Sequence, residues 1–241
     1  MTAPPMVVQH ALAAALIVVY PVWDLYDTRE MRAGTDPREK LRYYQRTLGF
    51  EWIVAALAVW ALGPKLFVFP AALPGISSSH AVVYRVAGYA LALLLVLLVL
   101  SPHIQAMRKP DVKEKVRQAL QRLQFMLPAT GQESRWFVVL SVTAGICEEV
   151  LYRGFLIRYL GRGPWQFGMM GAVMIAALAF GAAHLYQGPQ GFVNTAIGGL
   201  IFSAVFFLTG NLILPVLFHV AADCLLLPVW KGGARGEAKA E

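Results

Sequence analysis

Long apolar stretches alternate with charged segments along this chain. Residues 1–23 and 86–107 contain no Lys, Arg, Asp or Glu, and residues 163–222 form a 60-residue stretch that also contains none. About 20 apolar residues in a helix cross the core of a bilayer, and a membrane span must bond all its backbone polar groups internally. The pattern therefore predicts an all-α, polytopic transmembrane helical bundle.

Seven spans are expected from the apolar stretches. Their approximate limits are 6–23, 50–73, 81–101, 136–158, 165–184, 191–208 and 211–230. The second is interrupted by Pro64, Lys65 and Pro70, so it is expected to kink or split. The first lacks a basic leader and a small-residue cleavage site, so a retained span is favoured over a signal peptide.

The spans divide the chain into an N-terminal three-span region (1–135), a helical core (136–230) and a polar tail (231–241). Residues 111–127 repeat apolar side chains at helical spacing, and basic residues occupy the other faces. This predicts an amphipathic helix on the cytoplasmic leaflet, and a solvated connector helix is the alternative.

Basic residues set the expected orientation. The segments 24–49 and 102–135 carry six and seven Lys or Arg residues, and the tail carries three. With seven spans, all three segments fall on one side, and the excess of positive charge assigns that side to the cytoplasm. A bacterial or archaeal plasma membrane is the expected location.

Composition agrees with a membrane protein. Hydrophobic residues make up 58% and charged residues 15% of the chain, against roughly 25% charged residues in soluble domains. Such a chain has too few polar residues to cover a soluble globule, and it is too hydrophobic for disorder. Two cysteines exclude a disulfide scaffold. The net charge of +7 is interpreted as loop charge facing anionic lipid rather than a nucleic-acid surface.

Ionisable residues inside spans are costly and mark functional sites. In the core they are Glu148, Glu149, Arg153, His184, His219 and Asp223. Glu149 and Arg153 are four residues apart, the favourable spacing for an acid–base pair. Glu148 lies about 100° further round a helix, which leaves its carboxylate free for chemistry.

Three spans can thus direct a Glu, two His and an Asp into one cavity. A partly desolvated Glu can take a proton from water, and neutral His can orient water or bind a metal. Structural alternatives exist for each part. Glu149–Arg153 can be only a clasp, His184 an interfacial residue, and His219–Asp223 a packing hydrogen bond or a proton relay.

The three motifs together resemble a known family. E-E-x-x-x-R at 148–153, F-x-x-x-H at 180–184 and H-x-x-x-D at 219–223 are similar to the motifs of the CPBP (Abi) family. That family includes type II CAAX prenyl endopeptidases and bacteriocin-processing and immunity-type membrane proteins. F-x-x-x-H alone is uninformative, but all three in order on separate apolar stretches are specific.

The resemblance implies an intramembrane endopeptidase that acts on a membrane-associated or prenylated (CAAX-like) protein or peptide. It assigns water activation to Glu148, support to Glu149, Arg153 and the Phe180 position, water or metal binding to His184, and a place near the oxyanion to His219. The active site is expected toward the cytoplasmic side.

Asp223 departs from the Asn that the family often has at this position. An ionised Asp cannot donate to an oxyanion, but it can bind a metal or orient His219. A Zn²⁺ site formed by Glu148, His184, His219 and Asp223 and a metal-free site therefore both stay open.

The sequence gives less support to other functions of the core. The chain contains no H-E-x-x-H, G-x-S-x-G or G-x-G-D signature. A non-catalytic, immunity-like or scaffolding relative is the alternative function, and a small proton-relay transporter is a third, although no inverted repeat is evident.

Overall fold

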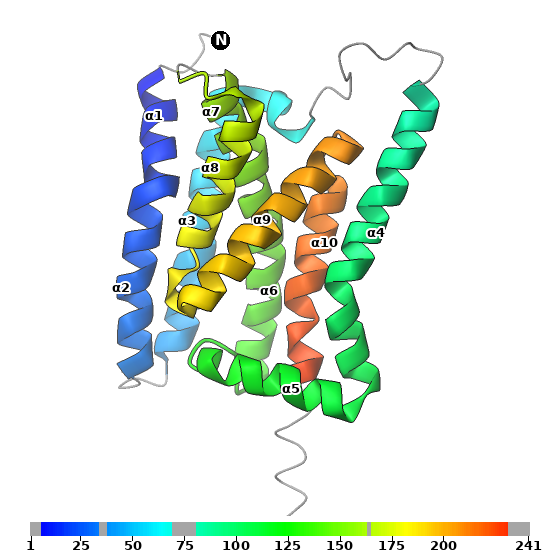
Figure 1. Cartoon of the computed structure of the whole chain (residues 1–241). Coiled ribbons are helices and arrows are strands. Elements are labelled where there is room, and N and C mark those ends of the chain that lie inside the picture. The colour runs from blue at the N-terminus through cyan, green and yellow to red at the C-terminus, as the bar shows by residue number, and fades with distance from the viewer. Residues whose placement is uncertain (1–5, 34–37, 69–80, 163–164, 231–241) are drawn as a thin grey trace, which may run out of the picture.

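The computed structural model describes residues 6–33, 38–68, 81–162 and 165–230. Within these ranges the chain is helical apart from short connections and one isolated β-bridge, which confirms the all-α fold (Figure 1). The α-helices are α1 (Met6–Ala14), α2 (Tyr20–Ala33), α3 (Glu39–Leu62), α4 (Ala81–Arg108), α5 (Pro110–Leu120), α6 (Gly131–Glu148), α7 (Ile157–Arg162), α8 (Gly168–Ala182), α9 (Pro189–Thr209) and α10 (Ile213–Cys224). The expected polar tail lies outside the described residues.

Segments of other helical types extend or connect these helices. The π-helical segments Ala15–Val19 and Glu149–Leu156 join α1 to α2 and α6 to α7, so each pair forms one long rod. Short 3₁₀ segments are Gly63–Phe67, Gln121–Leu123 and Leu185–Gln187.

Five helical stretches of the described chain are long and apolar enough to cross a bilayer. They are Met6–Arg29, Glu39–Phe67, Val82–Arg108, Pro189–Thr209 and Ile213–Trp230. The two other expected spans coincide with α8, which is apolar but shorter, and with the α6–α7 rod, which carries the motif charges. Each expected span therefore matches a helical stretch, and the number of crossings stays a prediction.

Two expected limits differ from the helix ends. The helix that contains the second expected span, α3, begins at Glu39, so the charged residues 39–49 are already helical. The expected end of that span, residues 69–73, lies outside the described residues. The amphipathic helix expected over 111–127 begins at Pro110, where proline suits a first helical turn, and ends at Leu120, followed by one 3₁₀ turn. Figure 1 shows α5 lying across the ends of the other helices.

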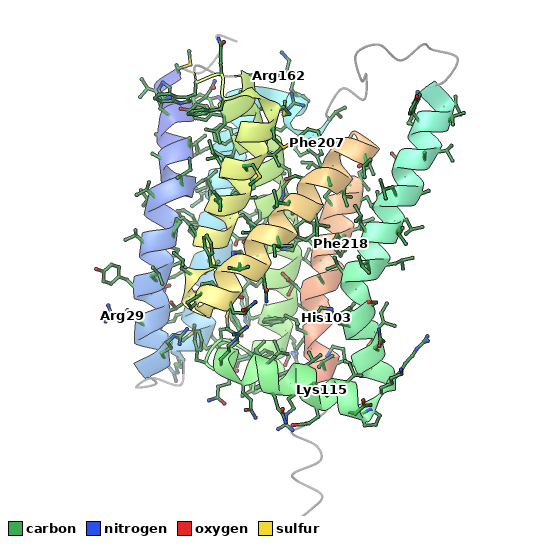
Figure 2. All side chains as sticks on the ribbon, viewed as in Figure 1. Arg29, His103, Lys115, Arg162, Phe207 and Phe218 are labelled. Carbon is green, nitrogen blue, oxygen red and sulfur yellow. The ribbon has the colours of Figure 1, made fainter. Side chains whose placement is uncertain are left out.

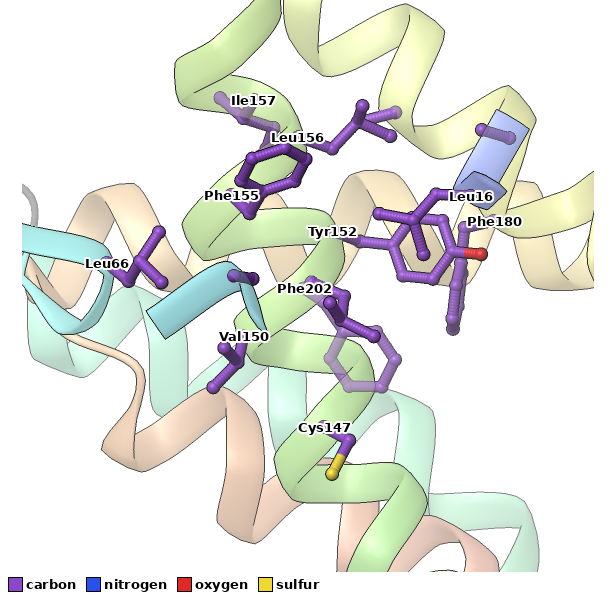
Figure 3. Close-up of a cluster of buried hydrophobic side chains, with 14 of the residues drawn as sticks. Leu16, Leu66, Cys147, Val150, Tyr152, Phe155, Leu156, Ile157, Phe180 and Phe202 are labelled. Atoms are coloured by element: carbon purple, nitrogen blue, oxygen red, sulfur yellow. The ribbon is translucent and has the colours of Figure 1, made fainter. Parts of the chain in front are cut away.

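The α6–α7 rod runs through the middle of the bundle. It packs against α3, α10 and α8, and α8 packs in turn against α9. Cys147, Val150, Phe155 and Leu156 belong to a large apolar cluster around this rod, together with Leu66 and residues of the neighbouring helices (Figure 3). This packing fixes the rod that carries the first motif.

A second apolar cluster lies beneath the first, at the α5 end. It joins Tyr44 of α3, Leu120 and Leu127 near α5, and Phe137 of α6. The Tyr44 hydroxyl donates to the Met126 carbonyl oxygen, so the segment after α5 is held against α3.

The outer surface of the bundle is apolar. α4 leans away from the neighbouring helices at one end (Figure 1) and exposes Val83, Val86, Leu94 and Leu98. A continuous exposed apolar surface of this kind fits contact with lipid rather than water. Charged side chains mark the two ends of the bundle: Figure 2 shows Lys115 at the α5 end and Arg162 at the other.

Candidate active site

The structure brings the three motifs together. Glu148 and Glu149 lie where α6 passes into its π-helical segment, and Arg153 follows within that segment. His184 lies just after α8, and α10 carries both His219 and Asp223. A π-helical turn inside an α-helix changes the direction of the side chains and is frequent at functional sites.

Glu149 and Arg153 form a fully buried clasp. The Arg153 Nη1 atom lies 3.0 Å from Glu149 Oε1, and Arg153 Nη2 donates to the Gly199 carbonyl oxygen at 3.3 Å. The guanidinium stacks on Phe180 and Phe202, with 4.4 and 4.9 Å to the ring centroids. Phe180 thus contacts the Arg153 side chain, and its supporting role stays a prediction. Arg153 is committed to Glu149.

His219 bridges the two glutamates. Its Nδ1 atom lies 3.0 Å from Glu149 Oε1, and its Nε2 atom lies 3.7 Å from Glu148 Oε2 and 3.9 Å from Asp223 Oδ2. The ring stacks on Phe202 with 4.8 Å between centroids. A carboxylate can only accept, so Glu149 fixes the proton on Nδ1 and leaves Nε2 facing Glu148 and Asp223.

His184 is held by its own helix. Its Nδ1 atom lies 2.9 Å from the Phe180 carbonyl oxygen, and the two rings pack edge to face at 5.0 Å. A carbonyl oxygen only accepts, so Nδ1 donates, and Nε2 of the neutral ring carries the lone pair. This ring nitrogen can accept a proton from a bound water molecule.

A cavity of about 130 Å³ joins these groups. Glu148, His184, His219 and Asp223 all line it. The volume exceeds the roughly 10–15 Å³ that one water molecule needs. Glu148 is 6% exposed, and its Oε2 atom has no hydrogen-bond partner, so a polar guest in the cavity would complete its bonding.

The first half of the chain supplies a wall that was not expected from the sequence: Tyr20 of α2 and Tyr43, Thr47 and Glu51 of α3 line the cavity. Tyr186, which follows His184, also lines it and was not expected either. The spacing of four residues between the three α3 side chains places them on one face of a helix and could have indicated a shared wall. This was not recognised because residues before 50 were expected to form a loop.

The four expected zinc ligands do not form a metal cluster in this arrangement. Within the described residues, no group of three His, Cys, Asp or Glu side chains is placed to hold a metal ion. Zinc binding stays a prediction that requires these side chains to rearrange.

The comparison with protein families confirms the resemblance. Residues 131–225 match the family described as "Type II CAAX prenyl endopeptidase Rce1-like". The match covers less than half of the chain, but it contains α6 to α10 with all three motifs. No curated protein and no solved structure gives a significant match.

Proposed function

We propose that the protein is an intramembrane endopeptidase in which Glu148 activates water, because residues 131–225 match the Rce1-like family of type II CAAX prenyl endopeptidases. The substrate is a membrane-associated or prenylated, CAAX-like protein or peptide. The catalytic cavity faces the cytoplasmic side of a bacterial or archaeal plasma membrane.

In the proposed reaction, a water molecule lies between Glu148 and His184. Glu148 takes one proton from it while the oxygen attacks the scissile carbonyl carbon. His184 Nε2 accepts a hydrogen bond from the water's other proton. When the tetrahedral intermediate collapses, the C–N bond breaks and Glu148 returns the proton to the leaving amine.

His219 is the proposed partner of the oxyanion. With Nδ1 bonded to Glu149, the protonated ring presents its Nε2–H toward Glu148 and Asp223, at the edge of the cavity. A preplaced donor of this kind stabilises charge that develops only in the transition state. The stacked Phe202 ring holds the imidazole plane in position.

The contrast between two adjacent carboxylates carries the proposal. Glu149 contacts both Arg153 and His219 and is not among the residues that line the cavity, whereas Glu148 lines it and its Oε2 atom has no hydrogen-bond partner. Of these two carboxylates, Glu148 is therefore the one placed to bind and deprotonate water.

Glu148→Gln tests the proposal, because the amide keeps the shape of the side chain but cannot act as a base. The variant and wild type are compared in proteoliposomes with farnesylated CAAX peptides and with unmodified membrane-anchored peptides, and the products are identified by mass spectrometry. General base catalysis contributes roughly 10²- to 10⁴-fold, so a loss of that size in kcat is expected.

Glu114→Gln, which changes an exposed acid on α5, is the matched control and should cleave like wild type. Equal cleavage by Glu148→Gln and wild type would overturn the assignment of Glu148. No cleavage of any peptide by wild type would support the alternative of an immunity-like or scaffolding relative.

A further inference from the structure

Glu51 is a buried carboxyl group that the proposed reaction does not use. It lies on α3, lines the catalytic cavity and is 4% exposed. Its Oε2 atom has no hydrogen-bond partner. An unpaired carboxylate in such a place costs free energy until a guest supplies the missing partner.

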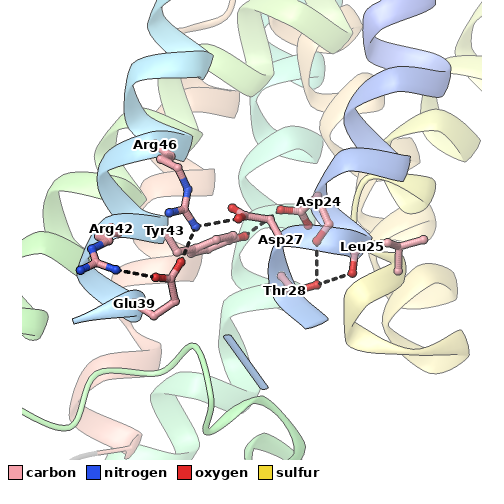
Figure 4. A network of polar contacts seen from close by, with 8 residues as sticks. All are labelled: Asp24, Leu25, Asp27, Thr28, Glu39, Arg42, Tyr43 and Arg46. Atoms are coloured by element: carbon pink, nitrogen blue, oxygen red, sulfur yellow. Dashed lines mark hydrogen bonds and ion pairs between the residues drawn. The ribbon is translucent and has the colours of Figure 1, made fainter. Parts of the chain in front are cut away.

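Tyr43 lies about two turns before Glu51 on the same face of α3. It lines the cavity, and its hydroxyl donates to Asp24 Oδ1 at 3.0 Å (Figure 4). Asp24 is itself buried on α2, where its backbone carbonyl accepts from the Thr28 hydroxyl at 2.7 Å. Because its proton is committed to Asp24, the Tyr43 oxygen is left as an acceptor.

Acidic groups outnumber cations around the cavity. Its lining includes the carboxyl groups of Glu51, Glu148 and Asp223, and no Lys or Arg is among the described lining residues. The His219 ring, the cation of the proposed reaction, lies beside Glu148 and Asp223. The nearby Arg153 is committed to Glu149. A cavity with this lining attracts positive charge and repels a free carboxylate.

We propose that Glu51 and Tyr43 form a subsite that binds a cationic group of the substrate, the ammonium or guanidinium of a residue next to the scissile bond. This inference rests on the proposed endopeptidase activity and assigns its substrate class. Glu51 supplies the counter-charge, and the Tyr43 hydroxyl oxygen accepts one further hydrogen bond.

Peptide sets that differ at one position test the subsite. Membrane-anchored peptides with an acetylated amino terminus carry Lys, Arg, norleucine or Glu at each position flanking the cleaved bond. At one position, wild type should cleave the Lys or Arg peptide with a kcat/KM roughly tenfold or more above that of the norleucine peptide. The Glu peptide should be the poorest substrate.

Glu51→Gln should bring the ratio of kcat/KM for the Lys and norleucine peptides close to one, mainly through a higher KM for the Lys peptide. Tyr43→Phe should lower the same ratio less, because it removes only one acceptor. Glu114→Gln should keep the wild-type ratio. Comparing the acetylated peptides with the same peptides carrying a free amino terminus shows whether the subsite binds a side-chain cation or a terminal amine.

Two results would overturn the subsite while leaving the endopeptidase function intact. One is cleavage by wild type with equal kcat/KM for Lys and norleucine peptides at every position. The other is a preference for Lys that persists unchanged in Glu51→Gln. Absence of any cleavage by wild type would instead overturn the function on which the inference rests.

Discussion

At the residue scale, the site separates a carboxylate held in a buried ion pair, Glu149, from one that lines the cavity, Glu148. Glu149 and Arg153 were predictable from the sequence, because a spacing of four residues on one helix is a local property. Their further contacts with His219, with the Gly199 carbonyl oxygen and with the rings of Phe180 and Phe202 depend on how α8, α9 and α10 pack.

Arg153→Met should destabilise the protein by roughly 3–5 kcal/mol, because it leaves Glu149 buried without its cation. Adding Glu149→Gln to that variant should recover part of the loss, since the uncompensated charge is then gone. Unfolding in detergent, followed by circular dichroism for both single variants and the double variant, measures the coupling. Strictly additive losses would contradict a buried ion pair.

Asp223 decides between the metal-free and zinc alternatives. In the metal-free reaction, Asp223→Asn should raise kcat, because the amide can donate to the oxyanion whereas an ionised carboxylate cannot. A strong chelator should then change neither form. Peptide cleavage with and without chelator, combined with elemental analysis, is the measurement.

A reversible loss of wild-type activity in chelator, restored by Zn²⁺, would establish the zinc alternative. Weaker zinc retention by Asp223→Asn would then identify Asp223 as a ligand.

At the element scale, the position of the site depends on the close crossing of α6 and α10. A Cβ atom at Gly145 would lie 2.5 Å from Val220 Cγ2 and 3.0 Å from the Val220 backbone nitrogen. Gly145 is one turn before Glu148, and Val220 follows His219. The absence of a side chain at Gly145 therefore sets the distance between the two helices that carry Glu148 and His219.

Gly145→Ala should separate these helices and destabilise the protein by about 1–3 kcal/mol, the usual cost of overpacking. This exceeds the gain of up to about 1 kcal/mol in helix propensity. Gly198→Ala is the matched control, because nothing lies within 4 Å of its Cβ position, and it should be neutral or stabilising. Thermal unfolding of both variants measures whether Gly145→Ala lowers the stability while Gly198→Ala leaves it unchanged or raises it.

The elements themselves were largely predictable from the apolar pattern, whereas their ends and irregularities were not. The charged turns of α3 before residue 50 resemble a loop in composition, yet Arg46 pairs with Asp27 at 2.6 Å and with Glu39 at 2.7 Å and stabilises them as helix (Figure 4). The π-helical segment after Glu148 has no compositional signal. Glu51 was missed because its place in the cavity wall depends on how α3 packs against α6.

At the scale of the whole molecule, the distribution of basic residues predicts which end faces the cytoplasm. Arg29 and Lys115 lie at the same end of the bundle and Arg162 at the other (Figure 2). Single cysteines at these positions, in a background without Cys147 and Cys224, should be labelled from the cytoplasm at 29 and 115 and from the opposite side at 162. Labelling of 29 and 115 from different sides would contradict the orientation.

The candidate cavity is shared between two stretches of chain, of which only the second lies in the family match. All motif side chains belong to residues 131–225, but Tyr20, Tyr43 and Glu51 from the first half complete the wall. Residues 131–225 on their own would lack these three side chains of the wall. If the proposed function holds, a chimera that joins this segment to the first half of a different family member is expected to keep the cleavage reaction and to change its preference among peptides.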